Sequence, residues 1–360
     1  MVSQVTYKHV VASRDYAFSV RLFSKVGMAR LLSERILVTG ATGFIGQRLI
    51  DRLVTAGCHV RAFVRDPLRF DRRQHGVEIV VGDVRDVKAV ETAVSGIDVV
   101  FHLAGKVHDL EELSDTGEHV EITIQGTRNV LTAAEKAGTA RLMFMSSLSV
   151  YGTPCELLRD ETAACAPCSA YGRAKLCAER IVLDVGVTSG MHVSCLRPAS
   201  VYGTGCKGNV VRMIELIDRG LFPPLPPVSS RRSMAYVGDV VEAAILAVSA
   251  PAANGRCYIV TDGRAYSSRE LYEAICRALA KRIPRWYVPL AVHRALARVG
   301  DAVGHIQGKR APFDSDAFVK LTGSDWYSCK RISEELGYHP SMTFEHALPE
   351  IVEWYRRSRG

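Results

Sequence analysis

The sequence has 360 residues, of which 48% are apolar and 23% are charged, and this is the composition of an ordinary globular protein. Such a chain is not a disordered polymer, a collagen or a coiled coil, and its length fits one large α/β unit or two coupled lobes. No stretch approaches the roughly 18 to 20 uninterrupted apolar residues of a membrane span, so none is expected. The formal net charge is +8, but the basic residues are scattered. This argues against nucleic-acid binding and suits a small polyanionic ligand such as a nucleotide diphosphate.

The ten cysteines are spread along the chain and do not form the dense framework of a small disulfide-rich domain. The spacing Cys165-Ala-Pro-Cys168 matches half of a zinc or redox motif. Because no second pair follows, we interpret it as a loop coincidence and expect no metal site. This cysteine usage indicates a reducing compartment, and we expect the protein in the cytoplasm.

Residues 1–27 contain four basic residues and one acid, and they lack the compact apolar core of a secretion signal. Three interpretations stay open: translation starts at Met28, whose segment runs straight into the first predicted strand; the segment is a true extension; or it is a targeting peptide. We therefore assign residues 1–33 to an N-terminal extension, either disordered or preceding the true start.

Short apolar, β-branched runs alternate with helical patterns over the first part of the chain. The predicted strands cover 35–39, 59–64, 77–82, 98–103, 141–146 and 192–196. The predicted helices cover 44–56, 87–94, 120–136 and 169–183. This alternation predicts βαβ units and a doubly wound parallel sheet, which is a Rossmann-type α/β fold.

After Pro198 the alternation becomes irregular. The segment 221–230 contains four prolines, which exclude a helix, and we expect an ordered loop over a site. Further elements are a strand at 258–260 and helices at 240–250, 268–280, 331–336 and 344–358. We therefore expect a dinucleotide-binding domain over 34–200 and a smaller C-terminal α/β lobe, over 201–360, that binds the substrate.

The segment Thr39-Gly40-Ala-Thr-Gly43-Phe-Ile-Gly46 follows a predicted strand and opens a predicted helix. Gly40 permits a tight turn, Gly43 lets the backbone approach a pyrophosphate, and Gly46 lets helix and strand pack closely. The helix N-terminus offers free amides and a positive dipole end to the phosphates. In this context the glycines predict a dinucleotide site, whose contacts also include Thr42, Phe44 and Ile45.

The end of the second predicted strand bears on the choice of cofactor. NAD-binding proteins usually place an acid there for the ribose 2′-hydroxyl. Here Val64 occupies that place and Arg65 follows. A guanidinium can pair with a 2′-phosphate, so Arg65 favours NADP, while NAD with Arg65 as an ordinary surface charge stays open.

The GxxGxxG spacing in TGATGFIG resembles the extended short-chain dehydrogenases/reductases, the NAD-dependent epimerase/dehydratase family. The similarity covers residues 35 to about 355 and looks most like UDP-glucose 4-epimerase-like proteins of bacterial polysaccharide pathways. It implies further cofactor contacts, near the adenine and along the ends of the fourth and sixth strands. These implied contacts are Asp83, Val84, Leu103, Ala104, Gly105, Pro198 and Val201.

Tyr171-Gly-Arg-Ala-Lys175 is a YxxxK motif on a predicted helix, and the i, i+4 spacing puts both side chains on one face. An ammonium near a phenol stabilises the phenolate, so we expect Lys175 to lower the pKa of Tyr171 from its usual value of about 10. Such a tyrosine exchanges a proton with a substrate hydroxyl while a nicotinamide exchanges hydride. Both residues are therefore expected at the cofactor and in catalysis.

The fifth predicted strand ends in MSSLSVYG. In the family that this sequence resembles, the catalytic Ser or Thr stands four residues before this Tyr-Gly, and here that residue is Ser147. The resemblance implies that Ser147 orients the substrate oxygen, with Ser146 and Ser149 as alternatives. One departure concerns the long helix, where the family often has Asn-Val-x-Gly-Thr and this chain has Thr123 in place of the Asn.

The resemblance also implies substrate contacts in the second lobe. In sugar-nucleotide epimerases an Arg five residues before the Val of Tyr-Val-x-Asp binds the diphosphate, and Arg232 stands in that place. Lys207 and Asn209 are further candidates. A homodimer formed through the two long helices is expected from the resemblance only.

Three functions are compatible with these features. The first is NAD(P)-dependent epimerisation at C4 of a UDP-hexose. The second is NADPH-dependent reduction of a 4-keto nucleotide sugar, or of a hydrophobic ketone as in the related 3β-hydroxysteroid dehydrogenases. The third is cofactor sensing without catalysis, against which the complete set of Ser147, Tyr171 and Lys175 argues. A dehydratase is less expected, because Leu148 and Ser149 stand where that chemistry needs an acid.

Overall fold

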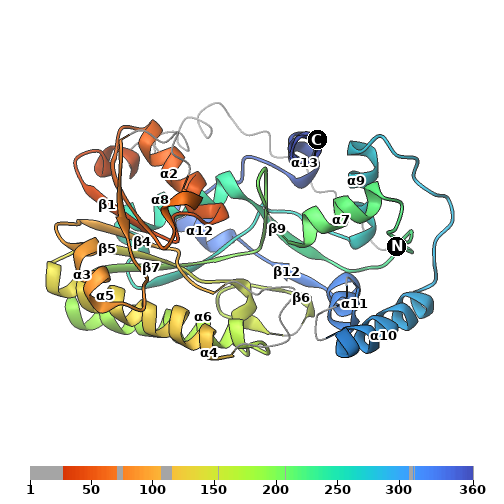
Figure 1. Cartoon of the computed structure of the whole chain (residues 1–360), viewed down its shortest axis with the longest axis horizontal. Coiled ribbons are helices and arrows are strands. Elements are labelled where there is room, and N and C mark those ends of the chain that lie inside the picture. The colour runs from red at the N-terminus through yellow and green to blue at the C-terminus, as the bar shows by residue number, and fades with distance from the viewer. Residues whose placement is uncertain are drawn as a thin grey trace, which may run out of the picture.

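A seven-stranded parallel sheet forms the larger lobe of the protein (Figure 1). The computed structural model describes residues 27–70, 76–106, 116–152, 154–206, 208–307, 311 and 313–359. The strand order is β10-β7-β5-β4-β1-β2-β3, and every neighbouring pair is parallel. The strands are β1 (Arg35–Thr39), β2 (His59–Val64), β3 (Val77–Val81), β4 (Val99–His102), β5 (Arg141–Met145), β7 (His192–Pro198) and β10 (Arg256–Val260).

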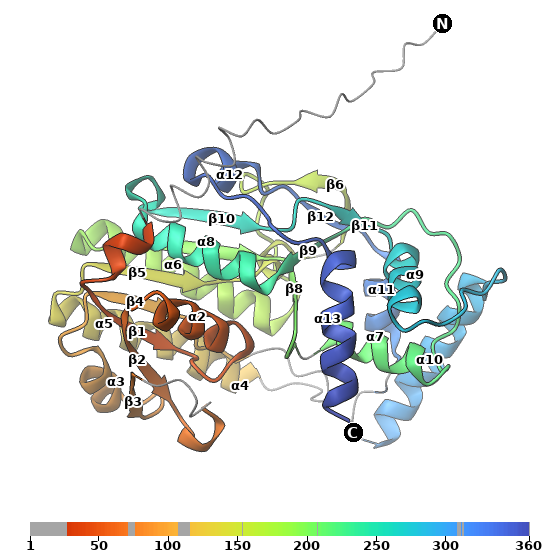
Figure 2. The ribbon, with the colours of Figure 1, turned by 90° about the horizontal axis from the view of Figure 1, so that it is seen from above.

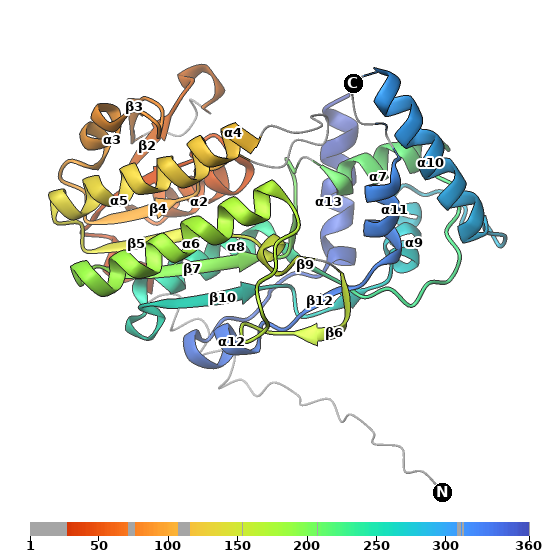
Figure 3. The ribbon, with the colours of Figure 1, turned by 90° about the horizontal axis from the view of Figure 1, so that it is seen from below.

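Helices cover both faces of this sheet, as Figures 2 and 3 show from opposite sides. The helices of one face are α2 (Phe44–Thr55) and α8 (Val237–Ser249), and those of the other are α3 (Val87–Val94), α5 (Gly126–Ala137) and α6 (Ala170–Ser189). The central strands β4 and β5 are therefore buried almost throughout, whereas the edge strand β3 is half exposed. Double coverage explains why the central strands are continuous apolar runs.

The strand order reverses direction at β1, from which the chain runs outward to β3 and then returns to β4 on the other side. In open sheets of this kind, ligands bind outside the carboxyl ends of the strands at such a reversal. The glycine loop after β1 and residues 103–106 after β4 meet at this place. The predicted fold class is confirmed.

The smaller lobe contains a second sheet of order β11-β9-β12-β6, to which β8 adds by pairing with β9. Its strands are β6 (Cys155–Arg159), β8 (Ser200–Tyr202), β9 (Arg232–Tyr236), β11 (Ala265–Tyr266) and β12 (Asp325–Tyr327). Its long helices are α7 (Asn209–Asp218), α9 (Ser268–Ala278), α10 (Leu290–Gln307), α11 (Ser315–Thr322) and α13 (Phe344–Arg357). The shorter helical pieces of the whole chain, in either lobe, are η1 (Pro67–Arg69), α4 (Thr116–Glu118), η3 (Leu148–Tyr151), η4 (Pro251–Ala253) and α12 (Lys330–Leu336). None of the described helices combines the length and apolar character needed to cross a bilayer.

The two sheets do not follow the division at residue 200 expected from the sequence. The strand β10 and the helix α8 come from the second half of the chain and complete the larger lobe, whereas β6 from the first half joins the second sheet. Residues 27–31 form a short helix whose Leu31 is fully buried in the larger core. The extension expected over 1–33 therefore does not include residues 27–31, while residues 1–26 lie outside the described part.

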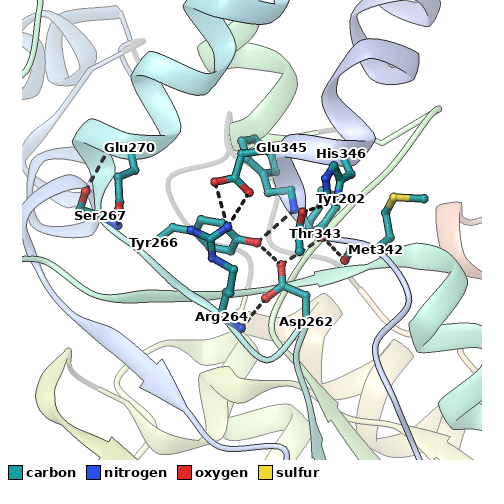
Figure 4. Close-up of polar contacts among 11 residues, drawn as sticks. Tyr202, Asp262, Arg264, Tyr266, Ser267, Glu270, Met342, Thr343, Glu345 and His346 are labelled. Atoms are coloured by element: carbon teal, nitrogen blue, oxygen red, sulfur yellow. Dashed lines mark hydrogen bonds and ion pairs between the residues drawn. The ribbon is translucent and has the colours of Figure 1, made fainter. Parts of the chain in front are cut away.

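A buried carboxylate joins the two lobes (Figure 4). The hydroxyls of Tyr202 and Tyr266 donate to Asp262 over 3.0 and 2.8 Å. Tyr202 also contacts the Met342 carbonyl, and Tyr266 accepts from the Phe344 amide at the start of α13. Because Asp262 follows β10 of the larger sheet, this cluster fixes β8, β11 and α13 against it. Burial raises the pKa of Asp262 from 3.8 to about 6, although the tyrosine hydrogen bonds oppose the shift.

The variant Asp262→Asn is expected to flatten the dependence of stability on pH. Because the pKa of Asp262 is raised in the folded protein, its neutral form contributes stability below about pH 4 that is lost as the pH rises through about 6. A shift of about two pKa units corresponds to about 3 kcal/mol. Urea unfolding at about pH 4 and about pH 7 should therefore show the variant gaining that amount relative to the wild type. The exposed Asp184→Asn should show no such gain, and an equal gain in both variants would contradict the assignment.

Candidate functional site

The glycine loop after β1 is too tightly packed for side chains. Gly40 has φ +68°, and a Cβ there would lie 2.7 Å from the backbone carbon of Leu103. A Cβ at Gly46 would collide with the carbonyl oxygen of Gly40, which already accepts from the Gly43 amide over 2.9 Å. The roles predicted for Gly40 and Gly46, a left-handed turn and close helix–strand packing, agree with this geometry.

The N-terminus of α2 is open to an anion. Its N-cap residue Gly43 is exposed and supplies no side-chain cap, and the first turn has no acidic residue. Thr42, Phe44 and Ile45 are half-buried around it. The first amides of a helix have no partners within the helix and lie at the positive end of its dipole. The loop therefore fits the pyrophosphate of a dinucleotide.

A chain of buried polar groups supports the end of β4. His102 lies between the hydroxyls of Thr39 (2.7 Å) and Thr127 (3.0 Å), and Thr127 donates to the Thr123 carbonyl. The Thr127 oxygen thus accepts from Nε2, and Nδ1 accepts from Thr39. Burial, and to a smaller degree the charge of Lys175, lowers the pKa of His102 to about 3, so this imidazole is neutral. Sequence reasoning missed it, because a histidine inside an apolar strand gives no signal of its partners.

Lys175 of α6 is buried beside the end of β4. Its Nζ donates to the Met145 carbonyl over 2.7 Å and lies 4.8 Å from the centre of the Phe144 ring. A Cβ on Gly105 would come within 2.9 Å of the same Nζ, so a larger residue there would displace the ammonium. Burial lowers the pKa of Lys175 to about 8. The structure thus brings together the ends of β4 and β5 and the predicted lysine.

Ser147 and Tyr171 meet directly after β5. Ser147 forms a hydrogen bond with Tyr171 that acts on the pKa of the phenol, and its Oγ also contacts the Ser149 Oγ over 3.2 Å and accepts from the Ser149 amide. The Ser146 hydroxyl is buried and has no hydrogen-bond partner among the described residues. Of the three serines considered from the sequence, Ser147 is the one bonded to Tyr171.

The pKa of Tyr171 moves in the opposite direction from the one predicted. Burial of the phenol raises its pKa, and the hydrogen bond with Ser147 offsets part of this rise. The predicted lowering by Lys175 is wrong for this arrangement, because the ammonium is held at the Met145 carbonyl and does not offset the burial of the phenol. Tyr171 is therefore a neutral phenol at neutral pH.

The long helix predicted over 120–136 is interrupted. Residues His119–Gln125 form a π-helical segment, η2, before α5 begins at Gly126. Within η2 the Thr123 hydroxyl accepts from the Lys106 amide over 3.2 Å, so the residue that departs from the family pattern fastens the segment after β4. The ring of His119 lies edge-on to Tyr171, with 6.0 Å between centroids. Such π-helical insertions are frequent at functional sites.

The last residue of β2 is an apolar Val64, and the first carboxylate after it belongs to the exposed Asp66. Val64 is buried, Arg65 is exposed, and the Asp66 carboxylate accepts from the Leu68 amide of its own turn. Beside them, Asp83 is gripped by Arg85 through two contacts of 2.9 and 3.1 Å, which lower the pKa of this carboxyl. Val84 is buried, with its carbonyl accepting from Asn129.

The predicted cofactor contacts Pro198 and Val201 lie at the border of the smaller lobe, and the predicted substrate residues Arg232 and Asn209 lie within it. Pro198 ends β7, and Val201 pairs with Ala235 in the parallel contact of β8 with β9. Arg232 begins β9 opposite Asp325; its burial lowers the pKa of the guanidinium and the carboxylate opposes this. Asn209 is exposed at the start of α7.

Lys207 lies outside the described residues. No hydrogen bond or ion pair joins Arg232 or Asn209 to the catalytic group in the part of the chain that the structure covers. Within that part there is also no cluster of three or more metal-binding side chains.

The model of the NAD-dependent epimerase/dehydratase family matches residues 36–260. The chain belongs to this family. It is accordingly an NAD(P)-dependent enzyme, and its glycine loop suits the nicotinamide cofactor of the family.

Similar proteins of the family differ in their substrates. The chain is 26% identical to an N-acetyl-alpha-D-glucosaminyl-diphospho-ditrans,octacis-undecaprenol 4-epimerase of Escherichia coli O157:H7, over 90% of this chain and 96% of the relative. It is 28% identical to a 3 beta-hydroxysteroid dehydrogenase/Delta 5-->4-isomerase of Mycobacterium tuberculosis, over 93% and 94%. The crystal structure of Thermus thermophilus UDP-glucose 4-epimerase in complex with NAD superimposes with a TM-score of 0.70 at 25% identity, covering 89% and 99%.

A buried ion pair holds the catalytic helix against the sheet of this family member. Arg197 of β7 donates through two nitrogens to Glu179 of α6, and through a third to the Tyr151 hydroxyl over 2.6 Å. Both charged side chains are almost fully buried. Since Tyr151 belongs to η3, directly after Ser147, one guanidinium fixes α6 and the Ser147 segment together. The positions of Ser147 and Tyr171 thus depend on Arg197, which the sequence did not indicate.

Glu179→Gln is expected to destabilise the protein by about 3 kcal/mol, because it leaves the Arg197 charge buried without a counter-charge. Urea unfolding of variant and wild type measures this difference. The matched control is Glu353→Gln, which removes an exposed pair with Arg357 on α13 and should change stability by less than about 0.5 kcal/mol. Similar losses in the two variants would show that the buried pair has no special structural role.

Proposed function

We propose that the protein oxidises and re-reduces C4 of a diphosphate-linked hexose, and that its activity is that of a UDP-hexose 4-epimerase. The observation that supports this is the hydrogen-bonded pair of Ser147 and Tyr171 beside Lys175 and Gly105, at the carboxyl edge of the sheet. The glycine loop fits the phosphates at the same edge, so a dinucleotide lying along it extends toward this pair.

Tyr171, Ser147 and Lys175 each have a separate proposed role at the C4 hydroxyl of the sugar. When bound, the oxidised nicotinamide supplies the hydride acceptor and a positive charge. Tyr171 removes the proton from O4 of the sugar and later returns it, while Ser147 holds O4 through its hydroxyl. Because burial raises the pKa of Tyr171, its phenolate forms only where positive charge offsets that burial, and the charge of the bound nicotinamide would have to act together with Lys175. The same two hydroxyls stabilise the charge that develops on O4.

Arg232 and Asn209 are the proposed diphosphate contacts, with Lys207 as a third. Arg232 suits this role because a guanidinium grips a phosphate through two parallel hydrogen bonds. Its burial next to Asp325 fixes its position, and a dianionic ligand would offset the burial of its charge. A homodimer formed through α5 and α6 stays a prediction.

Tyr171→Phe is expected to lower turnover of UDP-glucose to UDP-galactose, or of the N-acetyl pair, by roughly 100- to 10,000-fold, because the proton has no acceptor. Cofactor affinity, measured by fluorescence titration, should stay the same. Tyr287→Phe, at an exposed tyrosine of the smaller lobe, should leave turnover unchanged. Near-normal turnover of Tyr171→Phe would refute the acid–base role.

One-way reduction of a ketone is a second candidate, favoured by the raised pKa of Tyr171. A neutral phenol is ready to donate a proton to a carbonyl oxygen, as reduction requires. The ketone would be a 4-keto nucleotide sugar or a hydrophobic ketone of the 3β-hydroxysteroid kind. Mass spectrometry of the cofactor released from purified protein separates the candidates. Tightly held NAD supports epimerisation, since an epimerase recycles its cofactor, and an empty protein that prefers NADPH supports reduction.

We propose that in the reductase candidate Arg65 pairs with a 2′-phosphate and selects NADP over NAD, whereas in the epimerase candidate NAD is bound and Arg65 is an ordinary surface charge. Replacing it, as in Arg65→Asp, should weaken NADPH binding by roughly tenfold or more through loss of a charge-assisted contact, and should spare NADH. Arg69→Asp introduces the same charge change at a neighbouring exposed site and should alter the ratio of the two affinities far less. An unchanged ratio in Arg65→Asp would show that the 2′ group is read elsewhere.

A further inference from the structure

The helix α10 lies at the edge of the smaller lobe, away from the seven-stranded sheet (Figures 1 and 3). On its inner side His293, Ala297 and Gly304 are buried, and the His293 ring lies edge-on to Phe313. A Cβ at Gly300 would collide with the carbonyl oxygen of Phe313. The helix therefore attaches to its own lobe through residues that contribute little apolar area.

The larger apolar side chains of α10 point to solvent instead. They repeat at intervals of four, three, four and three residues, which places them on one face of the helix. We call this face, with two aromatic residues that precede the helix, the α10 stripe; it consists of Val292, Leu296, Val299, Val303, Ile306, Trp286 and Tyr287. Ile306 is 84% exposed, Trp286 64% and Val299 59%. A contiguous exposed patch of this kind usually marks an interaction surface.

The residues around the stripe are basic. Between 281 and 306 the chain has five lysines and arginines and one acid, Asp301. That acid is engaged, because Ser315 of α11 donates to its carboxylate through both amide and hydroxyl. Arg282, Arg285 and Arg298 are exposed and have no ion-pair partner in the part of the chain that the structure describes. The helix α11, which packs against α10, adds two acids, Asp314 and Asp316, and Asp314 accepts from the Ala317 amide. The excess of positive charge near the stripe therefore comes from the three arginines.

We propose that the α10 stripe docks on the surface of a membrane that contains anionic lipids. An amphipathic helix with an apolar face and a basic polar face lies in the plane of the bilayer interface, and Trp and Tyr prefer the headgroup level. The lipid charge complements the arginines. A second copy of the chain on the same face would bring two basic surfaces together, which is unfavourable.

Vesicle cosedimentation of the full-length protein tests the docking without any substrate. The wild type is expected to bind phosphatidylcholine vesicles that contain phosphatidylglycerol, and to bind pure phosphatidylcholine vesicles less. Added salt should weaken the binding, because it screens the arginines. The double variant Val299→Ser/Ile306→Ser should bind at least about tenfold more weakly, since two exposed apolar anchors are lost.

The control is the double variant Leu157→Ser/Val187→Ser, at two side chains that are 75% and 85% exposed on β6 and α6. It should bind vesicles like the wild type. Turnover of a soluble nucleotide sugar should be equal in all three proteins, so a failure of docking is distinguishable from a failure of the proposed function.

Three outcomes overturn the proposal. The first is no vesicle binding by the folded wild type, and the second is equal loss in the stripe and control variants. The third is a dimer, seen by light scattering, that the stripe variant converts to a monomer; it would assign the stripe to a second copy of the chain.

Discussion

The buried ammonium of Lys175 sets the constraints of the site. It is held at the Met145 carbonyl over the Phe144 ring, and a side chain at position 105 would displace it. The ends of β4 and β5 and the first turns of α6 must therefore keep fixed distances. A lysine in this position is costly to bury, and its pKa of about 8 expresses that cost. The ion pair of Arg197 and Glu179 on the same helix, and the neutral His102 nearby, stabilise the framework that keeps the ammonium in place.

Much of the larger lobe could be predicted from the sequence, because its signals are local. The β-branched runs and the glycine loop gave β1, β2 and α3 with the observed bounds, since double coverage makes such strands continuously apolar. In the smaller lobe the prediction missed β8, β9 and the long helix α10. The short strands have few residues in which a period can be seen. The buried side of α10 carries a histidine, an alanine and a glycine, so its larger apolar residues lie on the exposed side and did not indicate a helix packed on a core.

In the candidate site, too, some features could be predicted from the sequence and others could not. Tyr171 and Lys175 could be proposed from their types and spacing, and Ser147 from the resemblance to the family. The direction in which the pKa of Tyr171 shifts could not be predicted. It depends on burial and on the Met145 carbonyl that holds the ammonium, and neither is visible in a linear sequence. The interruption of the long helix by η2, which puts the His119 ring against Tyr171, was equally hidden. Partners supplied by distant segments, such as Glu179 for Arg197, follow from the fold alone.

Strand β10 from the second half of the chain lies in the larger sheet and β6 from the first half lies in the second sheet, and this affects how the protein can be divided into fragments. A fragment ending at residue 200 would leave β7 as an open edge, because its neighbour β10 comes later. It would also lack α8, which packs on β5 and β7 and is almost entirely apolar. The remaining half would lose β6 from the margin of its own sheet. Neither half is a candidate for separate expression, and splitting or grafting the substrate lobe requires at least two cuts that keep 237–260 with the nucleotide-binding part.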